Sequence, residues 1–216
     1  MVLFASLALA QPTHAQIDSA IWKPLTTRST DAGPVAVWEA QIAGMPCFRG
    51  DTVVSVPLRT LHDVSLDILG SLTWSKAGLA ESRVLAKSGA TIEYYQYLDI
   101  PGWTMASDRF WFLRLNQERT EQRATVRWDR MGERGGAHSA IYDEVVKAHP
   151  DAVEPTINIG GWTFTGQPTG THVDYRICTN PGGSLPSMVQ NAATKQTLPD
   201  TVADVIREAK RRAGAP

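Results

Sequence analysis

Strand-like segments, most of them separated from the next by turns too short to hold a helix, are the feature that most limits how this chain can fold. These segments cover residues 35–40, 51–56, 81–86, 91–99, 109–115, 123–130, 162–165 and 171–179. Apolar or β-branched side chains recur along them, and Ser88-Gly89 and Pro101-Gly102 mark two of the turns. A parallel pair of strands would need a crossover of a dozen or more residues. We therefore predict hairpins and an antiparallel meander.

Three segments with helical spacing interrupt or end this pattern. Residues 58–69 carry apolar side chains three or four positions apart, and the excursion at 131–160 holds one short helical turn. The longest segment is 185–209, in which we expect Pro199 to kink or restart the helix. Its apolar face comprises Leu185, Met188, Val189, Ala192, Leu198, Val202, Val205 and Ile206. Strands grouped together, with helices set apart from them, are typical of an α+β fold rather than of βαβ units.

Size and charge favour one soluble domain and exclude a nucleic-acid partner. The 216 residues include 21 Lys and Arg against 22 Asp and Glu, so the chain has no basic field of the kind that binds phosphate backbones. The one basic run, at 210–212, is interpreted as a solvated helix end. No apolar stretch is long enough to cross a bilayer.

The first residues resemble a secretory signal. An apolar run is followed by Thr13-His14-Ala15, which places small residues at the two positions that a signal peptidase reads, although a positive n-region is missing. We expect a signal peptide at 1–15, a polar lead-in at 16–34 with one short helix near Ala20, and a periplasmic or secreted protein. The alternative, an ordinary N-terminal strand or helix, stays open.

Two cysteines are too few for a disulfide framework. In an exported protein Cys47 and Cys178 would oxidise if their Cα atoms lay within about 7 Å. Free buried cysteines are also common apolar fillers, so the sequence leaves the bond open.

The sequence contains no motif typical of catalysis or metal binding. The histidines are His14, His62, His138, His149 and His172, and none belongs to an HExxH motif. His172, Asp174 and Arg176 share one strand face and could form a catalytic or metal cluster. Polar residues alternating with apolar ones are also what a half-exposed strand requires, and we favour that interpretation. We expect no catalytic residue, no metal and no cofactor.

Aromatic side chains are concentrated in the strand-like segments. They are Tyr94, Tyr95, Tyr97, Trp103, Phe110, Trp111, Phe112, Trp128, Trp162, Phe164 and Tyr175. On the inner face of a sheet that meets a helix, such rings either fill a solid core or line a cavity for an apolar ligand. Composition alone leaves both interpretations open.

Four stretches resemble the START (steroidogenic acute regulatory protein-related lipid transfer) family. They are residues 91–115, with an SDR strand entry, 124–131, 160–166, and 171–210, where a strand leads through Pro-Gly-Gly-x-x-Pro into the final helix. The resemblance implies a helix-grip fold, a curved antiparallel β-sheet wrapped around a long C-terminal α-helix, which would occupy residues 35–212. It also implies that the domain holds one lipid in an internal cavity.

The resemblance further implies an acidic and a basic side chain at the polar end of the ligand. The nearest candidates are Glu93 or Gln96 with Arg109 or Arg114, and strand parity leaves open which pair faces inward. The family's strand entry reads Arg-Asp, whereas Arg109 is followed by Phe110 here. We include Arg109 among the ligand-binding candidates.

The predicted function is to bind and sequester or transfer one lipid or sterol-like molecule, as a monomer that contacts membranes transiently. The residues that we expect to line the cavity are Tyr94, Trp111, Leu113, Val126, Trp128, Val173, Tyr175 and Ile177, with Met188, Val189 and Ala192 from the final helix. Apolar burial contributes about 0.8 kcal/mol per CH₂, so binding needs few polar contacts and no motif. The alternatives are a cyclase- or hydrolase-like enzyme that uses the same cavity, and a structural domain with a solid core.

Cleavage after Ala15 should give a mature protein that begins at Gln16. Mass analysis of the exported protein measures its N-terminus directly. Full-length protein recovered from the cytoplasm would rule out export.

Overall fold

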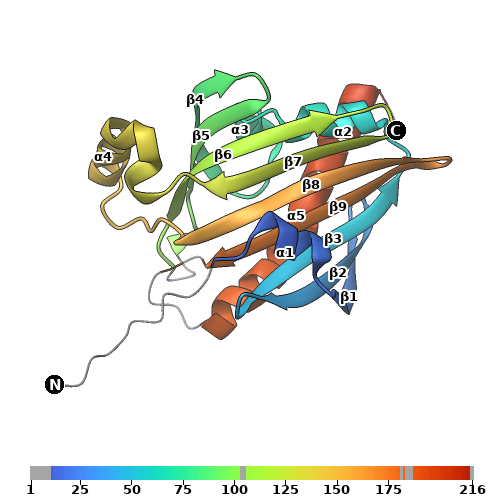
Figure 1. The fold of residues 1–216 in the computed structure, drawn as a ribbon, viewed down its shortest axis with the longest axis horizontal. Coiled ribbons are helices and arrows are strands. Elements are labelled where there is room, and N and C mark those ends of the chain that lie inside the picture. Colours follow the sequence, from blue (N-terminus) through green and yellow to red (C-terminus); the bar gives the residue numbers. More distant parts are fainter. Residues whose placement is uncertain (1–10, 103–105, 181, 183–186, 215–216) are drawn as a thin grey trace.

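A single curved sheet of nine antiparallel strands forms the frame of the protein (Figure 1). The computed structural model describes residues 11–102, 106–180, 182 and 187–214, without the side chains of 187–194. The strands are β1 Lys23–Thr30, β2 Gly33–Ile42, β3 Met45–Val54, β4 Leu79–Ser88, β5 Thr91–Leu98, β6 Arg109–Arg119, β7 Arg123–Arg130, β8 Ile157–Gln167 and β9 Gly170–Asn180. Their order is β1-β2-β3-β9-β8-β7-β6-β5-β4, which confirms the predicted hairpins and meander.

Helices cover the two faces of the sheet unequally. The helices are α1 His14–Ser19, α2 Leu58–Ser65, α3 Ser71–Trp74, the 3₁₀ helix η2 Glu133–His138, α4 Ser139–Ala148 and α5 Ser187–Ala213. The long α5 crosses behind the sheet in Figure 1 with α2 and α3 beside it, whereas α1 lies in front. None of the helices in the described part of the chain is both long and apolar enough to cross a membrane.

The apolar stripe of α5 grips the concave face of the sheet. Leu198, Val202, Ile206 and Ala209 recur every three or four residues and are at most 2% exposed. Gly50 on β3 makes this close approach feasible, because a Cβ atom there would lie 2.5 Å from Leu198 Cδ2. The helix continues through position 199, so the predicted restart at the proline is not observed.

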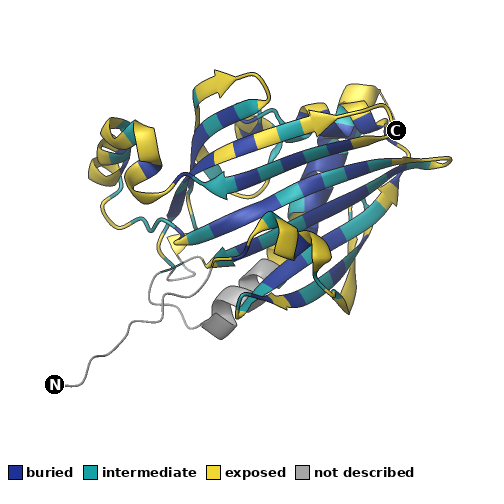
Figure 2. Ribbon diagram, in the orientation of Figure 1, coloured by how far each residue is buried: buried dark blue, intermediate teal, exposed yellow. Residues whose placement is uncertain are grey.

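Strands β5 and β6 are buried on both faces, which explains their aromatic content. Tyr94 and Leu113 point to the concave side, whereas Tyr95 and Phe112 pack under α4 on the other side. Figure 2 shows the resulting dark stripes along the middle strands. The strong aromatic signal of residues 94–97 and 110–112 therefore comes from two separate clusters.

Two elements near the N-terminus differ from the sequence prediction. Residues 23–30, expected as part of a lead-in, form the edge strand β1, and the short helix expected near Ala20 begins earlier, at His14. Seven of the eight β1 residues are exposed, so this strand carries no alternating pattern that could have predicted it. Residues 1–10 of the predicted signal peptide lie outside the described residues.

Cys47 and Cys178 form a buried disulfide between β3 and β9. The two residues are register partners, their Cα atoms are 4.4 Å apart, and Ile17 of α1 packs against them. The bond closes a loop with a sequence separation of 131 residues. Closing so long a loop stabilises the fold by about 5 kcal/mol in the chain-entropy account.

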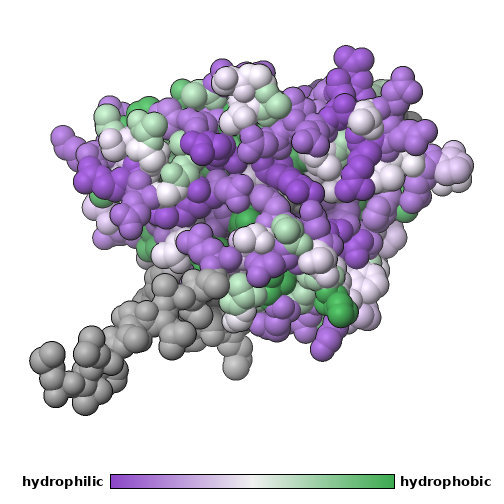
Figure 3. All heavy atoms as spheres, viewed as in Figure 1, coloured by the Kyte–Doolittle hydropathy of each residue, from purple (hydrophilic) through white to green (hydrophobic). Residues whose placement is uncertain are grey.

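The convex face carries a network of ion pairs. Arg49 bonds Asp51 and Asp174, and Arg176 bonds Asp174 and lies 3.5 Å from Asp18 of α1. His172 and Arg176 on the polar face of β9 are half-buried, as expected of a half-exposed strand, whereas Asp174 is only 4% exposed and is paired within this network. Figure 3 shows the largely hydrophilic surface on this side.

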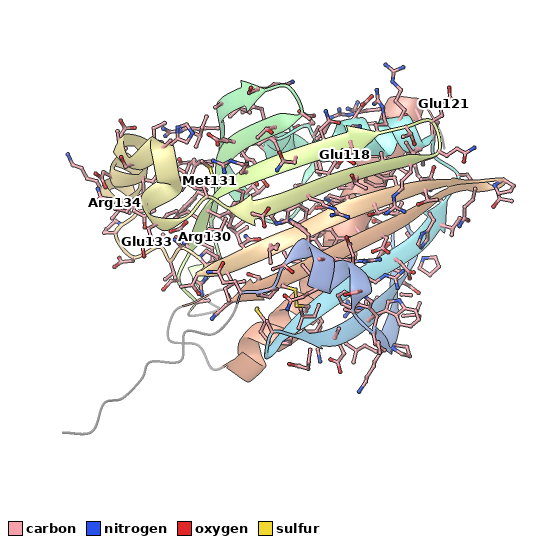
Figure 4. The ribbon with its side chains drawn as sticks, in the orientation of Figure 1. Glu118, Glu121, Arg130, Met131, Glu133 and Arg134 are labelled. Atoms are coloured by element: carbon pink, nitrogen blue, oxygen red, sulfur yellow. A yellow bond between two sulfur atoms is a disulfide. The ribbon has the colours of Figure 1, made fainter. Side chains whose placement is uncertain are left out.

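In Figure 4, Arg130 and Arg134 lie at the α4 end of this face, far from Glu118.

His62 on α2 generates a prediction about pH. It is 2% exposed, its Nδ1 lies 3.3 Å from Arg119 Nη1, and no described group bonds its Nε2. Burial, reinforced by the nearby Arg119 charge, lowers the pKa of the imidazole. Below about pH 6.5 the unfolded chain therefore binds a proton that the folded protein does not, and stability falls as pH decreases.

Chemical denaturation of the wild type and of His62→Gln between pH 8 and 5 measures this effect. The wild type should lose up to about 1.4 kcal/mol of unfolding free energy per pH unit more than the variant below pH 6.5. Parallel curves for the two proteins would show that His62 is not the titrating group.

Candidate functional site

A cavity of about 490 Å³ lies between the concave face and the helices α2, α3 and α5. The backbone of α5 lies close to α2 and to strands β1, β2 and β3. The same helix contacts the β5–β7 half of the sheet less. The walls of the cavity are mainly aromatic and aliphatic side chains. They include Ile68, Trp74, Tyr94, Leu98, Trp111, Leu113, Leu115, Val126, Trp128, Trp162, Tyr175 and Ile177.

Most of the residues that we expected to line a cavity lie together around this one. Eight of the candidates line the cavity: Tyr94, Arg109, Trp111, Leu113, Val126, Trp128, Tyr175 and Ile177. Val173 does not, because it lies in the packed core opposite Phe164, nearer the β8–β9 turn. The side chains of Met188, Val189 and Ala192 lie outside the described residues.

Of the four polar candidates, Glu93 or Gln96 with Arg109 or Arg114, Gln96 and Arg109 face the cavity. Both line the cavity, and they are 8% and 6% exposed. Glu93 and Arg114 face the other side of the sheet. There Arg114 donates a hydrogen bond to Glu93, and Glu93 also forms a hydrogen bond with His138. The hydrogen bonds from His138 and Arg114 keep the pKa of Glu93 below its usual value. That pair therefore belongs to the convex face.

Gln96 is the centre of a satisfied hydrogen-bond network. Its Nε2 donates to Ser71 Oγ at 2.9 Å and to Ser82 Oγ at 3.2 Å. Its Oε1 accepts from Trp111 Nε1 at 3.3 Å. The network joins α3 to β4, β5 and β6 and fixes the plane of the Trp111 ring, so Gln96 positions the wall of the cavity.

A glycine makes room for the second tryptophan of the wall. A Cβ atom at Gly160 would lie 2.5 Å from Trp128 Cζ2, so the ring rests directly on the backbone of β8. The Trp128 Nε1 donates to Asn158 Oδ1 at 3.0 Å. Gly160 and Asn158 were not predicted, although the Gly-Gly pair inside a strand run is a signal of close approach.

Arg109 lies at one end of the cavity. Its Nη1 donates to the carbonyl oxygens of Ser107 and Asp108, and its Nη2 donates to that of Gly182 at 3.1 Å. Its Nε is buried without a partner. Burial lowers the pKa of the guanidinium from its ordinary value, with Asp108 opposing the shift, and arginine stays charged at neutral pH.

Two tyrosine hydroxyls lie in the same cavity. Tyr94 and Tyr175 are 6% and 8% exposed, and both side chains line the cavity. Burial raises the pKa of both phenols, so the two groups stay protonated at neutral pH. They are available as donors to a ligand.

The α3–β4 connection and α5 form another part of the cavity wall. Exposed lining residues gather there, among them Lys76 and Asp200. The buried carboxylate of Asp204 joins these two elements, because it accepts from Ser75 Oγ at 3.3 Å and from Lys76 N at 2.5 Å. Arg207 also bonds Asp204. These contacts depend on tertiary structure and leave no mark in the sequence pattern.

The titratable groups of the wall do not form a metal site. In the described part of the chain no group of three or more His, Cys, Asp and Glu side chains could hold a metal ion. The carboxylates of the wall, Asp67, Asp200 and Asp204, lie on α5 and beside α3.

Comparisons with known proteins identify the architecture. No family model matches the chain. An uncharacterized protein of Pseudomonas aeruginosa is 24% identical over 194 residues, which cover 88% of each chain. A STAR-related lipid transfer protein of Xanthomonas axonopodis superposes with a TM-score of 0.69 at 19% identity, over 88% of this chain and 98% of that one. An aromatase/cyclase of Streptomyces sp. R1128 superposes with a TM-score of 0.54 at 13% identity, over 79% and 98%.

The likeness to the Xanthomonas structure spans nearly the whole of both chains, and it includes the curved sheet and the long final helix. This protein therefore folds as a START-like domain with the helix-grip α+β architecture.

Proposed function

We propose that the protein binds a single lipid or other elongated apolar molecule in its cavity and sequesters or transfers it. The observation that carries the proposal is the cavity itself, whose volume of about 490 Å³ lies within the range of small-molecule sites. Ordinary protein interiors pack without voids of this size. An apolar wall with a few donors at fixed places is suited to a ligand with a long apolar part. The similar Xanthomonas protein, which is described as a lipid transfer protein, supports this proposal.

Binding is favoured over catalysis by the titratable groups of the wall. A general acid or base works best with a pKa near the working pH, and burial moves the phenols of Tyr94 and Tyr175 away from neutrality. Asp204 is engaged by Arg207, Ser75 and a backbone N–H. The cyclase with the same architecture keeps the enzymatic alternative open to test.

We also propose that the protein is exported, acts as a monomer and contacts membranes transiently while it loads or releases its ligand. The signal-like residues 1–15 and the disulfide between Cys47 and Cys178 support export, because such bonds persist in oxidising compartments.

Native mass spectrometry of the purified protein, followed by organic extraction, tests the proposal most directly. A stoichiometric adduct that disappears on extraction and is recovered as one lipid class is expected. Protein that carries no adduct and takes up no lipid from mixed vesicles would favour a structural domain.

Val126→Trp tests whether this interior is a cavity or a packed core. Val126 is fully buried and lines the cavity, so a larger ring should enter the space with little loss of stability and should abolish lipid uptake. In a tightly packed core the same change would cost about 1 to 3 kcal/mol or more.

Thr125→Trp, on the opposite face of β7, is the matched control and should leave lipid uptake unchanged. Thermal melts and a vesicle uptake assay read out both variants. A sharply lowered melting temperature for Val126→Trp, with no lipid bound by the wild type, would contradict the proposal.

A further inference from the structure

The segment before β1 is built into the convex face of the sheet. Helix α1 lies on this face in Figure 1, and its Ile17, which is 3% exposed, packs over the disulfide. On β7, Asp129 Oδ2 lies 3.1 Å from His14 Nε2, and Arg127 Nη2 donates to Asp18 Oδ2 at 2.7 Å. The contacts of this segment with the sheet therefore include residues before Ile17.

Residues on both sides of Ala15 are needed to form α1. Thr13 is the N-cap and forms a capping box with Gln16, in which Thr13 Oγ1 accepts from Gln16 N at 3.3 Å and Gln16 Oε1 accepts from Thr13 N at 2.9 Å. Ile17 N donates to the Thr13 carbonyl oxygen at 3.0 Å, and Pro12, immediately before the cap, is buried. A helix of six residues is too short to be stable by itself, so α1 depends on this cap and on its contacts with the sheet.

Cleavage after Ala15, which we expected from the sequence, would divide this helix. It would remove Thr13 and His14, and with them the cap and a contact with β7. Only residues 16–19 of α1 would remain, which is about one helical turn. A signal peptidase acts on the chain before it folds, so the fold does not protect either bond, and the two sites differ in the protein that they leave. A chain cut after Ala15 would lack the residues that hold Ile17 over the disulfide.

The sequence offers a second cleavage site that leaves α1 complete. Residues 8–10 read Ala-Leu-Ala and follow the apolar run that begins at Val2, so alanine stands at both positions that a signal peptidase reads. Residues 13–15 read Thr-His-Ala, with threonine at the first of these positions. The upstream site is therefore nearer to the A-x-A pattern, and cleavage there keeps Pro12 and all that follows it.

We propose that the processing site is the bond between Ala10 and Gln11, so that the mature protein begins at Gln11 and α1 stays whole over the disulfide. Hydrolysis breaks the amide C–N bond, and water supplies the hydroxyl of the new Ala10 carboxyl group and a hydrogen to the Gln11 amine. The inference rests on the proposed export, and it replaces Gln16 by Gln11 as the expected N-terminus. It does not depend on what the cavity binds.

Expression of the full chain in a Gram-negative host, with intact-mass analysis of the periplasmic protein, tests the processing site. The wild type should begin at Gln11, which makes it heavier than a chain that begins at Gln16 by the mass of residues 11–15. Cyclisation of an N-terminal glutamine would lower either mass by one ammonia only. A periplasmic protein that begins at any other residue would overturn the Gln11 site. Full-length protein in the cytoplasm would overturn export itself, and neither result would count against lipid binding.

Ala10→Arg and Ala15→Arg form a matched pair of variants. A signal peptidase requires a small residue before the cleaved bond, so Ala10→Arg should lose the product that begins at Gln11. Ala15 is exposed on α1, so Ala15→Arg should fold and should be processed as the wild type is. Loss of processing in Ala15→Arg, with normal processing of Ala10→Arg, would place the site after Ala15.

Reduction of the disulfide by dithiothreitol tests what the complete helix does. Both cysteines are fully buried, so reduction requires a local opening that uncovers them. A purified chain that begins at Gln16 should open more often than one that begins at Gln11, and its disulfide should be reduced about 5-fold to 30-fold faster. Thr13→Ala in the longer chain should increase the rate in the same direction. Equal rates for all three proteins would show that α1 covers the disulfide without its cap, which would overturn the structural reason for the Gln11 site.

Discussion

Close packing of α5 against β2 and β3 is the interaction on which the rest of the structure depends. Gly50 lets Leu198 and Val202 reach the sheet, and each aliphatic side chain buried there contributes about 1.5 to 3 kcal/mol. Because the helix approaches one half of a curved sheet so closely, it cannot pack equally well against the other half. The cavity lies in the space left between the helices and strands β5 to β9, and the same contact that stabilises the domain thus leaves room for it.

The interior combines satisfied and unsatisfied polar groups, and the difference is informative. Gln96 uses both ends of its amide to hold Trp111 and α3, which makes it part of the frame. The Nε of Arg109 has no such partner in the described structure. Leaving a buried donor unpaired costs free energy. Arg109 Nε therefore lowers the stability of the domain, whereas the Gln96 amide does not.

Much of the fold could be predicted from the sequence, because side chains along a β-strand point alternately to its two faces and residues two positions apart share a face. Tyr94, Trp111 and Val126 were placed inward on that basis, and the structure agrees. The edge strand β1 could not be predicted, since a strand that is exposed on both faces has no alternation of apolar and polar side chains. The choice between Arg109 and Arg114 was left open, although Arg109 shares the parity of Trp111 and could have been placed inward with it.

The order of the strands has a consequence for how the chain acquires its structure. β3 pairs with β9, so strands β1 to β3 join the rest of the sheet only through β9, the last strand in the sequence. Helix α5 follows β9 in the sequence. The ladder at the middle of the sheet therefore links segments more than 100 residues apart, as the separation of 131 residues between Cys47 and Cys178 shows. Contacts between such distant segments slow folding, because the entropy of closing the loop is lost before the contacts form. Most of the polypeptide must be available before the central ladder can close, so folding is completed late in synthesis or after it.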